Sequence, residues 1–169
     1  LRTHARAIEE RTAALSGLID QAETVRSLFG YESPTETARD LTQLLTEVVD
    51  EMSHAYPDAT LTISESDSVH VRADDRLKRA LLELLENAIV HNDQPTPEVP
   101  VTTRPSSAER TGEWIEIVIA DNGPGIPDQE RKTIERGEET PLQHGTGLGL
   151  WIVYWTVSLY GGDISLEDN

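Results

Sequence analysis

Glu83 and Asn87 lie four residues apart in a stretch with helical periodicity, so their side chains share one face of the expected helix. An amide oxygen is a suitable ligand for Mg²⁺, which takes few protein ligands and keeps water and phosphate oxygens. Glu83, one turn earlier, could orient or deprotonate an attacking group. Taken alone, the pair equally fits the solvated face of an ordinary helix, where acids and amides are common.

A second segment, Asp121-Asn122-Gly123-Pro124-Gly125-Ile126, follows the strongest strand pattern in the chain. A carboxylate there could accept a hydrogen bond from the amino group of adenine and would repel the carbonyl oxygen of guanine. The two glycines would let the backbone approach a flat base. The alternative is a plain tight turn, because Asn-Gly and Pro-Gly are common turn dipeptides.

A third segment, His144-Gly145-Thr146-Gly147-Leu148-Gly149-Leu150, opens an expected helix. Its glycines let successive backbone amides converge on an anion, and a helix start adds partial positive charge. A P-loop is excluded because no lysine is present here. A dinucleotide-binding fingerprint is excluded because Leu150 stands where it needs glycine, and because a polar run rather than a strand precedes it.

The first helix is predicted over residues 1–29, with apolar residues in alternating steps of four and three. It is either a coiled-coil partner or a single amphipathic helix, and Gly30 and Pro34 end it. The remaining expected elements are a helix over 37–55, strands over 59–63 and 69–72 joined as a hairpin, a helix beginning at Asp74 or Asp75, an edge strand over 99–103, a strand over 114–120, a helix over 148–159 and the start of a strand over 163–166.

Composition narrows the class of protein. The 31 acidic and 14 basic residues give a net charge of −17, which repels nucleic acid. We hypothesise salt adaptation, as in a halophilic archaeon; the alternative is an ordinary acidic cytosolic domain. Cysteine is absent and no apolar run reaches the length of a membrane span, so we expect a cytoplasmic protein. The missing initial methionine suggests a piece of a longer chain.

In order and spacing, the three segments resemble the N box, G1 box and G2 box of histidine kinases and related ATPases with the Bergerat fold. The resemblance covers residues 35 to 168. It implies an α+β fold, a two-layer sandwich of a mixed sheet and three helices, which binds ATP and Mg²⁺ under a lid. The residues it implies at the site are Asn87 as the magnesium ligand, Glu83 as the catalytic residue, and His91, Asp121, Gly123, Gly125, Ile126, Gly145, Thr146, Gly147, Leu148 and Gly149 around the nucleotide.

Departures from the family pattern accompany the resemblance. Val90 stands where kinases commonly have a basic residue that meets phosphate, and the lid over 127–144 is short, with Ile134 a loose substitute for its usual phenylalanine. Weak or lid-dependent ATP affinity is therefore expected. The remaining candidates for neutralising phosphate are Arg131, Lys132, Arg136 and His144.

The resemblance also implies partners. Residues 1–30 resemble the second helix of a dimerisation hairpin, so we expect a homodimer in the intact protein. His4 lacks the neighbours of a phosphoacceptor, and the acceptor histidine is expected upstream of Leu1. The function predicted is the catalytic core of a two-component sensor kinase that serves a response-regulator receiver domain. The alternatives are an ATP-hydrolysing conformational switch, favoured by Glu83, and an inactive signalling scaffold.

Overall fold

The computed structural model describes residues 37–64, 68–106, 112–127, 131 and 147–167. Contacts divide the chain into two units, Leu1–Ser33 and Pro34–Asn169. The account that follows concerns the second unit. The helix expected over residues 1–29 lies outside the described residues, as does His4.

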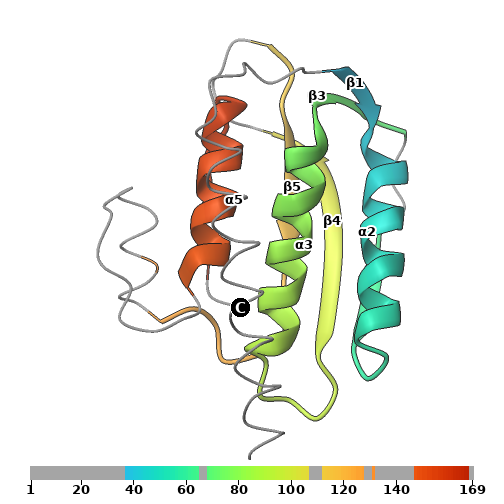
Figure 1. Ribbon diagram of the computed structural model, residues 1–169, viewed down its shortest axis with the longest axis vertical. Helices are drawn as coiled ribbons and strands as arrows, with labels where there is room; N and C mark the ends of the chain where they lie inside the picture. Colours follow the sequence, from blue (N-terminus) through green and yellow to red (C-terminus); the bar gives the residue numbers. More distant parts are fainter. Residues whose placement is uncertain (1–36, 65–67, 107–111, 128–130, 132–146, 168–169) are drawn as a thin grey trace, which may run out of the picture. The chain divides into compact units, whose positions relative to one another are not determined.

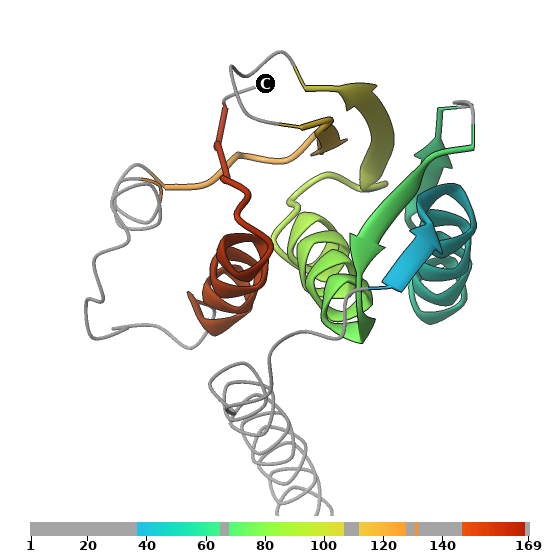
Figure 2. The same ribbon diagram turned by 90° about the horizontal axis from the view of Figure 1, so that it is seen from above.

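The described part is a layer of three helices against a mixed sheet, as the resemblance implied. In chain order the elements are β1 (Thr37–Asp40), α2 (Leu41–Ala55), β2 (Thr60–Ile63), β3 (His70–Ala73), α3 (Asp75–Val90), β4 (Glu98–Pro105), β5 (Ile115–Ile119) and α5 (Gly147–Leu159). Strand β4 is parallel to β2 and antiparallel to β5, while β1 and β3 form a separate antiparallel pair. Figures 1 and 2 show α3 between α2 and α5 in a single layer.

The main core lies between α2, α3 and the sheet. Helix α2 contributes every third or fourth residue to it, which gives one apolar face. The buried members of this core are Leu41, Leu44, Leu45, Val48, Val49, Met52, Leu81, Leu85, Ile89, Val99 and Val101. Ile115, Ile117 and Ile119 of β5 pack against it, so the alternation read from the sequence is confirmed.

Aspartates cap both of the helices that follow the strands β1 and β3. Asp40 accepts the backbone N–H of Gln43 at 3.1 Å, and Asp74 accepts that of Arg76 at 3.0 Å. Such caps satisfy backbone donors that have no partner inside the helix. Of the two candidates for the start of α3, Asp74 is therefore the cap and Asp75 the first helical residue.

Two expectations about the N-terminal strands were wrong. The helix expected over 37–55 begins only at Leu41, because residues 37–40 form β1 and pair with β3. The hairpin expected between 59–63 and 69–72 does not form, since β2 pairs with β4 and β3 pairs with β1. Both errors concern backbone partners that are distant in sequence, which local alternation does not reveal.

Two further expectations about strands were also wrong. Strand β4 is the middle strand of the described sheet rather than an edge. It tolerates Pro100 because this residue lies opposite Ala120, just beyond the end of β5, and its carbonyl accepts the Ala120 N–H at 3.2 Å. Residues 163–166, expected to begin a strand, pair with none of the described strands.

No helix within the described ranges has the length and apolar character needed to cross a bilayer.

Candidate functional site

The flank of α3 that faces α5 carries the first pair of predicted site residues. Glu83 and Asn87 lie one turn apart, and the first turn of α5 packs directly against them. A Cβ atom added at Gly149 would lie 2.8 Å from Glu83 Oε2 and 3.2 Å from Asn87 Nδ2. The first distance is shorter than a Cβ atom adopts and the second is tight, so a larger residue here would have to displace the Glu83 and Asn87 side chains.

Glu83 is a buried carboxylate with a single ion-pair partner among the described residues. Its Oε1 lies 2.6 Å from Arg79 Nη2, and 9% of its side chain is exposed. Burial raises the pKa of Glu83; the charge of Arg79 opposes this shift and that of Glu86 adds to it. Oε2 is left facing Gly149. Glu83 is thus a carboxyl group whose environment favours proton uptake, as a general base requires.

Asn87 presents a polar group that the protein does not satisfy. Its Nδ2 atom is buried and has no hydrogen-bond partner in the described part of the chain. Buried amides in folded proteins are nearly always paired, and an exception calls for a functional or structural explanation. Asn87 Nδ2 is therefore a buried donor without a protein partner beside the first turn of α5.

The loop after β5 is shaped around Asp121. The backbone N–H of Gly123 donates to Asp121 Oδ1 at 2.8 Å. A Cβ atom at Gly123 would lie 2.8 Å from this same oxygen and 3.1 Å from Asn92 Cγ. Gly125 adopts φ +76°, which favours glycine. Both glycines of the segment are therefore required by the backbone path that presents Asp121.

Two asparagines that the sequence did not single out as site residues join this loop to α3. Asn92, just past the end of α3, donates from Nδ2 to Asn122 Oδ1 at 2.8 Å. Asn122 Oδ1 also accepts the Glu98 N–H at 3.0 Å, and its Nδ2 donates to the Thr96 carbonyl at 3.2 Å. We call Asn92 and Asn122 the amide clasp. Its only signal in the sequence is the turn-forming character of asparagine.

The clasp brings two of the three predicted segments to one end of one helix. Asn87 and Asn92 are five residues apart, which corresponds to about 7 Å along a helix axis. The end of α3, the start of α5 and the segment after β5 lie at the same end of the helical layer (Figure 1). The structure thus brings Glu83, Asn87 and Gly149 into contact and holds the Asp121 loop beside them.

The other predicted residues are less closely involved or lie beyond the described ranges. His91 is exposed directly after α3, and Ile126 is half-buried in the loop after β5. Gly147 and Leu148 begin α5. Gly145, Thr146, Lys132, Ile134, Arg136 and His144 lie outside the described residues. Arg131 is described, and its backbone N–H donates to the Pro127 carbonyl at 3.0 Å.

The donor set fits Mg²⁺ better than a transition metal. Within the described ranges, no three His, Cys, Asp or Glu side chains gather to hold an ion. Mg²⁺ does not need such a cage, since it is commonly held by one or two protein oxygens together with substrate phosphates. The side-chain oxygen of Asn87, 3.8 Å from a Cβ atom added at Gly149, is such a group.

Comparisons with known proteins agree with this geometry. The family model described as histidine kinase-, DNA gyrase B-, and HSP90-like ATPase matches residues 72–169. The nitrogen regulation protein NtrY of Azorhizobium caulinodans is 32% identical over 137 residues, which cover 80% of this chain and 18% of NtrY. The adaptive-response sensory kinase SasA of Prochlorococcus marinus is 34% identical over 134 residues, covering 74% of this chain and 35% of SasA. The chain therefore spans only a minor part of these relatives.

Among solved structures, the ATP binding domain of PrrB from Mycobacterium tuberculosis matches with a TM-score of 0.60 and 26% identity. The match covers 80% of this chain and 88% of that domain. A mycobacterial sensor histidine kinase, MprB, matches with the same TM-score at 27% identity, over 75% of this chain and 81% of that one.

Proposed function

Because the chain belongs to the family of histidine kinase-, DNA gyrase B- and HSP90-like ATPases, we propose that it is the ATP-binding catalytic core of a two-component sensor histidine kinase. It would transfer the γ-phosphoryl group of ATP to a histidine elsewhere in the intact protein. The proposal rests on two contacts of α3. Gly149 packs against Glu83 and Asn87, and the amide clasp holds the Asp121 loop at the end of the same helix.

The Asp121 loop is the proposed adenine site. The Asp121 carboxylate accepts the adenine amino group, while Gly123 and Gly125 leave the backbone free to approach the base. His91, directly after α3, and Ile126, within the loop, are the proposed contacts to the rest of the nucleoside. An acceptor-only carboxylate disfavours guanine, which presents a carbonyl oxygen at the corresponding position.

The phosphates are assigned to the other end of the site. The residues proposed to bind them are Gly145, Thr146, Gly147, Leu148 and Gly149, through the backbone N–H groups at the start of α5. Asn87 would hold Mg²⁺, which neutralises phosphate charge when bound. Glu83 is proposed to accept the proton of the attacking imidazole, a role that its burial and raised pKa suit.

Nucleotide selectivity tests the adenine assignment. We expect Asp121→Asn to weaken binding of a non-hydrolysable ATP analogue with Mg²⁺ by roughly tenfold to a hundredfold, the usual contribution of a hydrogen bond to a charged group. Isothermal titration calorimetry on the 169-residue chain measures this. Asp93→Asn is the matched control, since it removes the same charge from an exposed neighbouring residue. Equal affinity in wild type and Asp121→Asn would refute the assignment.

Partners follow from the same proposal. The sensory kinases among the relatives suggest a response-regulator receiver domain as the final phosphoryl acceptor. We also propose a cytoplasmic location and a homodimer formed through the N-terminal helix of the intact protein. Labelled ATP should mark the intact protein on histidine and then the receiver domain on aspartate. Labelling that Asp121→Asn leaves at the wild-type level would contradict the proposal.

An ATP-hydrolysing conformational switch is the second candidate, because Glu83 lies buried next to Gly149, where it could activate water instead of a protein nucleophile. Steady phosphate release by the 169-residue chain without an acceptor would favour this function. Absence of phosphate release together with histidine labelling in the intact protein would favour the kinase. No nucleotide binding at all would point to a signalling scaffold.

Salt adaptation is a separate proposal that rests on the net charge of −17. Self-repulsion between acidic side chains weakens when salt screens it. We therefore expect the melting temperature to rise between low and high concentrations of potassium chloride. Greater stability at low salt would contradict the proposal.

A further inference from the structure

Helices α3 and α5 run antiparallel and approach each other closely at two places. At the end proposed to bind nucleotide, Gly149 packs on Glu83 and Asn87. At the opposite end, Tyr160 directly follows α5 and contacts Asp74 at the start of α3. Gly149 and Tyr160 are 11 positions apart, which corresponds to about 17 Å along a helix axis. A displacement of α5 at the Tyr160 end would therefore be carried to Gly149.

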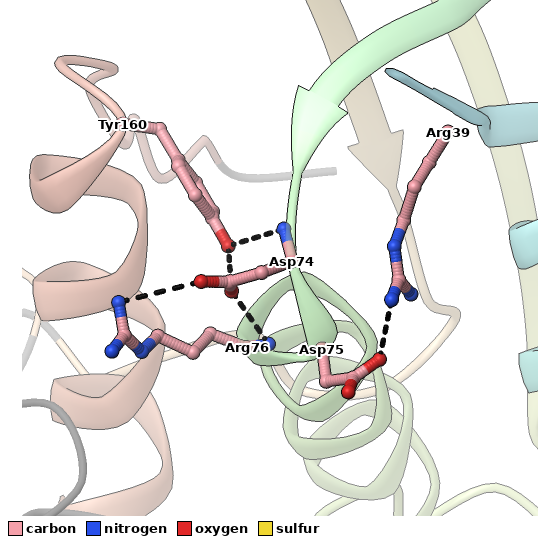
Figure 3. Close-up of polar contacts among 5 residues, drawn as sticks. All are labelled: Arg39, Asp74, Asp75, Arg76 and Tyr160. Carbon is pink, nitrogen blue, oxygen red and sulfur yellow. Dashed lines mark hydrogen bonds and ion pairs between the residues drawn. The ribbon is translucent and has the colours of Figure 1, made fainter. Parts of the chain in front are cut away.

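The contact between Tyr160 and Asp74 is reciprocal (Figure 3). The hydroxyl of Tyr160 donates to Asp74 Oδ1 at 2.6 Å and accepts the backbone N–H of Asp74 at 3.3 Å. Arg76 holds the same carboxylate, with its backbone N–H at 3.0 Å from Oδ1 and its Nη1 at 3.4 Å from Oδ2. Burial and the hydrogen bond to Asp74 raise the pKa of Tyr160 to about 12, so it keeps its proton at neutral pH.

Both partners have fixed backbones because both cap helices. Asp74 is the N-cap of α3. Tyr160 precedes Gly161, whose φ is +75°; the Gly161 N–H donates to the Ser158 carbonyl at 3.0 Å and that of Gly162 to the Val157 carbonyl at 2.9 Å. These two bonds define a Schellman motif, which ends a helix in a set geometry. The hydrogen bonds between the two side chains therefore join one rigid helix end to another.

Between these two ends, the polar groups on α3 and α5 provide little directional restraint. Among the described residues, Arg79 Nε on α3 and Thr156 Oγ1 on α5 are buried without hydrogen-bond partners. The buried residues of α5 are otherwise mainly apolar, and apolar contacts depend weakly on direction. The hydrogen bonds between Tyr160 and Asp74 therefore add a directional restraint that apolar packing does not supply.

We propose that Tyr160 and Asp74 form a latch that fixes α5 along α3 and thereby holds the glycine-rich start of α5 against Glu83 and Asn87. They are positioning residues, since they act on the site through α5 from its far end. The consequence for nucleotide affinity rests on the function proposed above. The anchoring of α5 does not, and it can be measured separately.

The chain contains a matched control for this latch. Tyr56, at the end of α2, donates its hydroxyl to Glu86 Oε1 on α3 at 2.9 Å. Its pKa is also raised to about 12, by burial and by this bond. Tyr56 therefore makes the same kind of bond to α3, but it joins α2 instead of α5. Tyr56→Phe and Tyr160→Phe remove equivalent hydroxyl groups from the two neighbours of α3.

Two measurements on the wild-type 169-residue chain and both variants test the latch. The first is amide hydrogen exchange, read at residues 149–155 of α5 and across α2. We expect Tyr160→Phe to speed exchange in α5 and to leave α2 unchanged, with the reverse for Tyr56→Phe. The second is calorimetry with a non-hydrolysable ATP analogue and Mg²⁺, in which Tyr160→Phe should bind roughly three- to tenfold more weakly and Tyr56→Phe like wild type.

Asp74→Asn provides a conservative variant, because asparagine still caps a helix and still accepts the tyrosine hydroxyl. It should stay within about twofold of wild-type affinity, the loss expected from a weakened rather than absent hydrogen bond. Exchange in α5 that is equal in Tyr160→Phe and wild type would overturn the latch, as would equal losses of affinity in the two tyrosine variants. If the wild type binds no nucleotide, the proposed function fails. Hydrogen exchange alone then decides whether Tyr160 and Asp74 anchor α5.

Discussion

The two flanks of α3 differ in their buried side chains: one flank is apolar, and the other carries polar atoms without hydrogen-bond partners. Leu81, Leu85 and Ile89 form an apolar stripe at four-residue spacing and belong to the core shared with α2. Arg79, Glu83 and Asn87 form a second stripe at the same spacing, offset by two residues and hence on the opposite side of the helix. All three members of the first stripe are buried in apolar contacts, whereas the second holds a buried acid and two unpartnered nitrogen atoms.

This difference separates stability from function within one helix. Burial of the apolar stripe favours folding by removing hydrocarbon from water. Buried polar atoms without partners oppose folding, and proteins keep them mainly where a ligand or a reaction uses them. The α2 flank therefore anchors α3, and the α5 flank carries the groups that we propose meet the nucleotide.

Truncation of the apolar stripe should have the largest effect. Leu85 is 1% exposed, and Leu85→Ala should lower the free energy of unfolding by about 2–5 kcal/mol through lost burial and the cavity left behind. Urea denaturation measures the loss. The affinity of the folded protein for an ATP analogue should stay close to that of wild type. A large loss of affinity without a loss of stability would reverse the assignment of the two flanks.

An added methyl group at the helix contact should have the next largest effect. Gly149→Ala places a carbon atom against Glu83 and Asn87, so the contact must open, at a cost of about 1–3 kcal/mol. Both the melting temperature and the affinity for the ATP analogue should fall. Ser158→Ala is the control on the same helix, because Ser158 is exposed. Unchanged affinity in Gly149→Ala would show that the close approach at this glycine does not serve the site.

Removal of the unpartnered amide should affect binding far more than folding. Asn87→Ala should change the free energy of unfolding by less than about 1 kcal/mol, because Nδ2 makes no hydrogen bond whose loss would count. The magnesium-dependent part of ATP-analogue binding should disappear. Calorimetry with and without Mg²⁺, combined with urea denaturation, checks both expectations. Strong destabilisation with intact binding would assign Asn87 to the core instead.

The smallest effect concerns the pH dependence of stability. Because folding raises the pKa of Glu83, its contribution to stability is fully present below its ordinary value of 4.5 and is lost as the pH rises through the folded-state value. Glutamine does not titrate, so Glu83→Gln should gain stability relative to wild type between pH 4.5 and pH 8. Urea denaturation over this range measures the difference. If the difference in free energy of unfolding between Glu83→Gln and wild type does not change with pH, burial does not shift the pKa of Glu83.

Patterns that repeat along a single element predicted the structure well. The apolar face of α2 and the isoleucines of β5 were confirmed, and of the two caps offered for α3, Asp74 and Asp75, the structure uses Asp74. Pairings between distant segments were not predictable in the same way. Alternation marked β2 and β3 as strands but gave no information on their partners, and residues 37–40 showed no pattern that indicates a strand.

In the candidate site, too, local sequence patterns were informative and contacts between distant segments were not predictable. Motif spacing predicted Glu83, Asn87, Asp121 and the glycines as residues of one site, and the placement of Gly149 against Glu83 and Asn87 agrees with that prediction. Asn92, Asn122 and Tyr160 were not identified, because their importance comes from the partners they meet in the fold.

A crystal structure of the chain with a non-hydrolysable ATP analogue and Mg²⁺ tests most directly whether the end of α3 is the nucleotide site. We predict the adenine amino group at hydrogen-bond distance from Asp121, the metal at Asn87 and the phosphates at the start of α5. An analogue bound away from α3, or one whose base and phosphates contact neither Asp121 nor Asn87, would contradict the account.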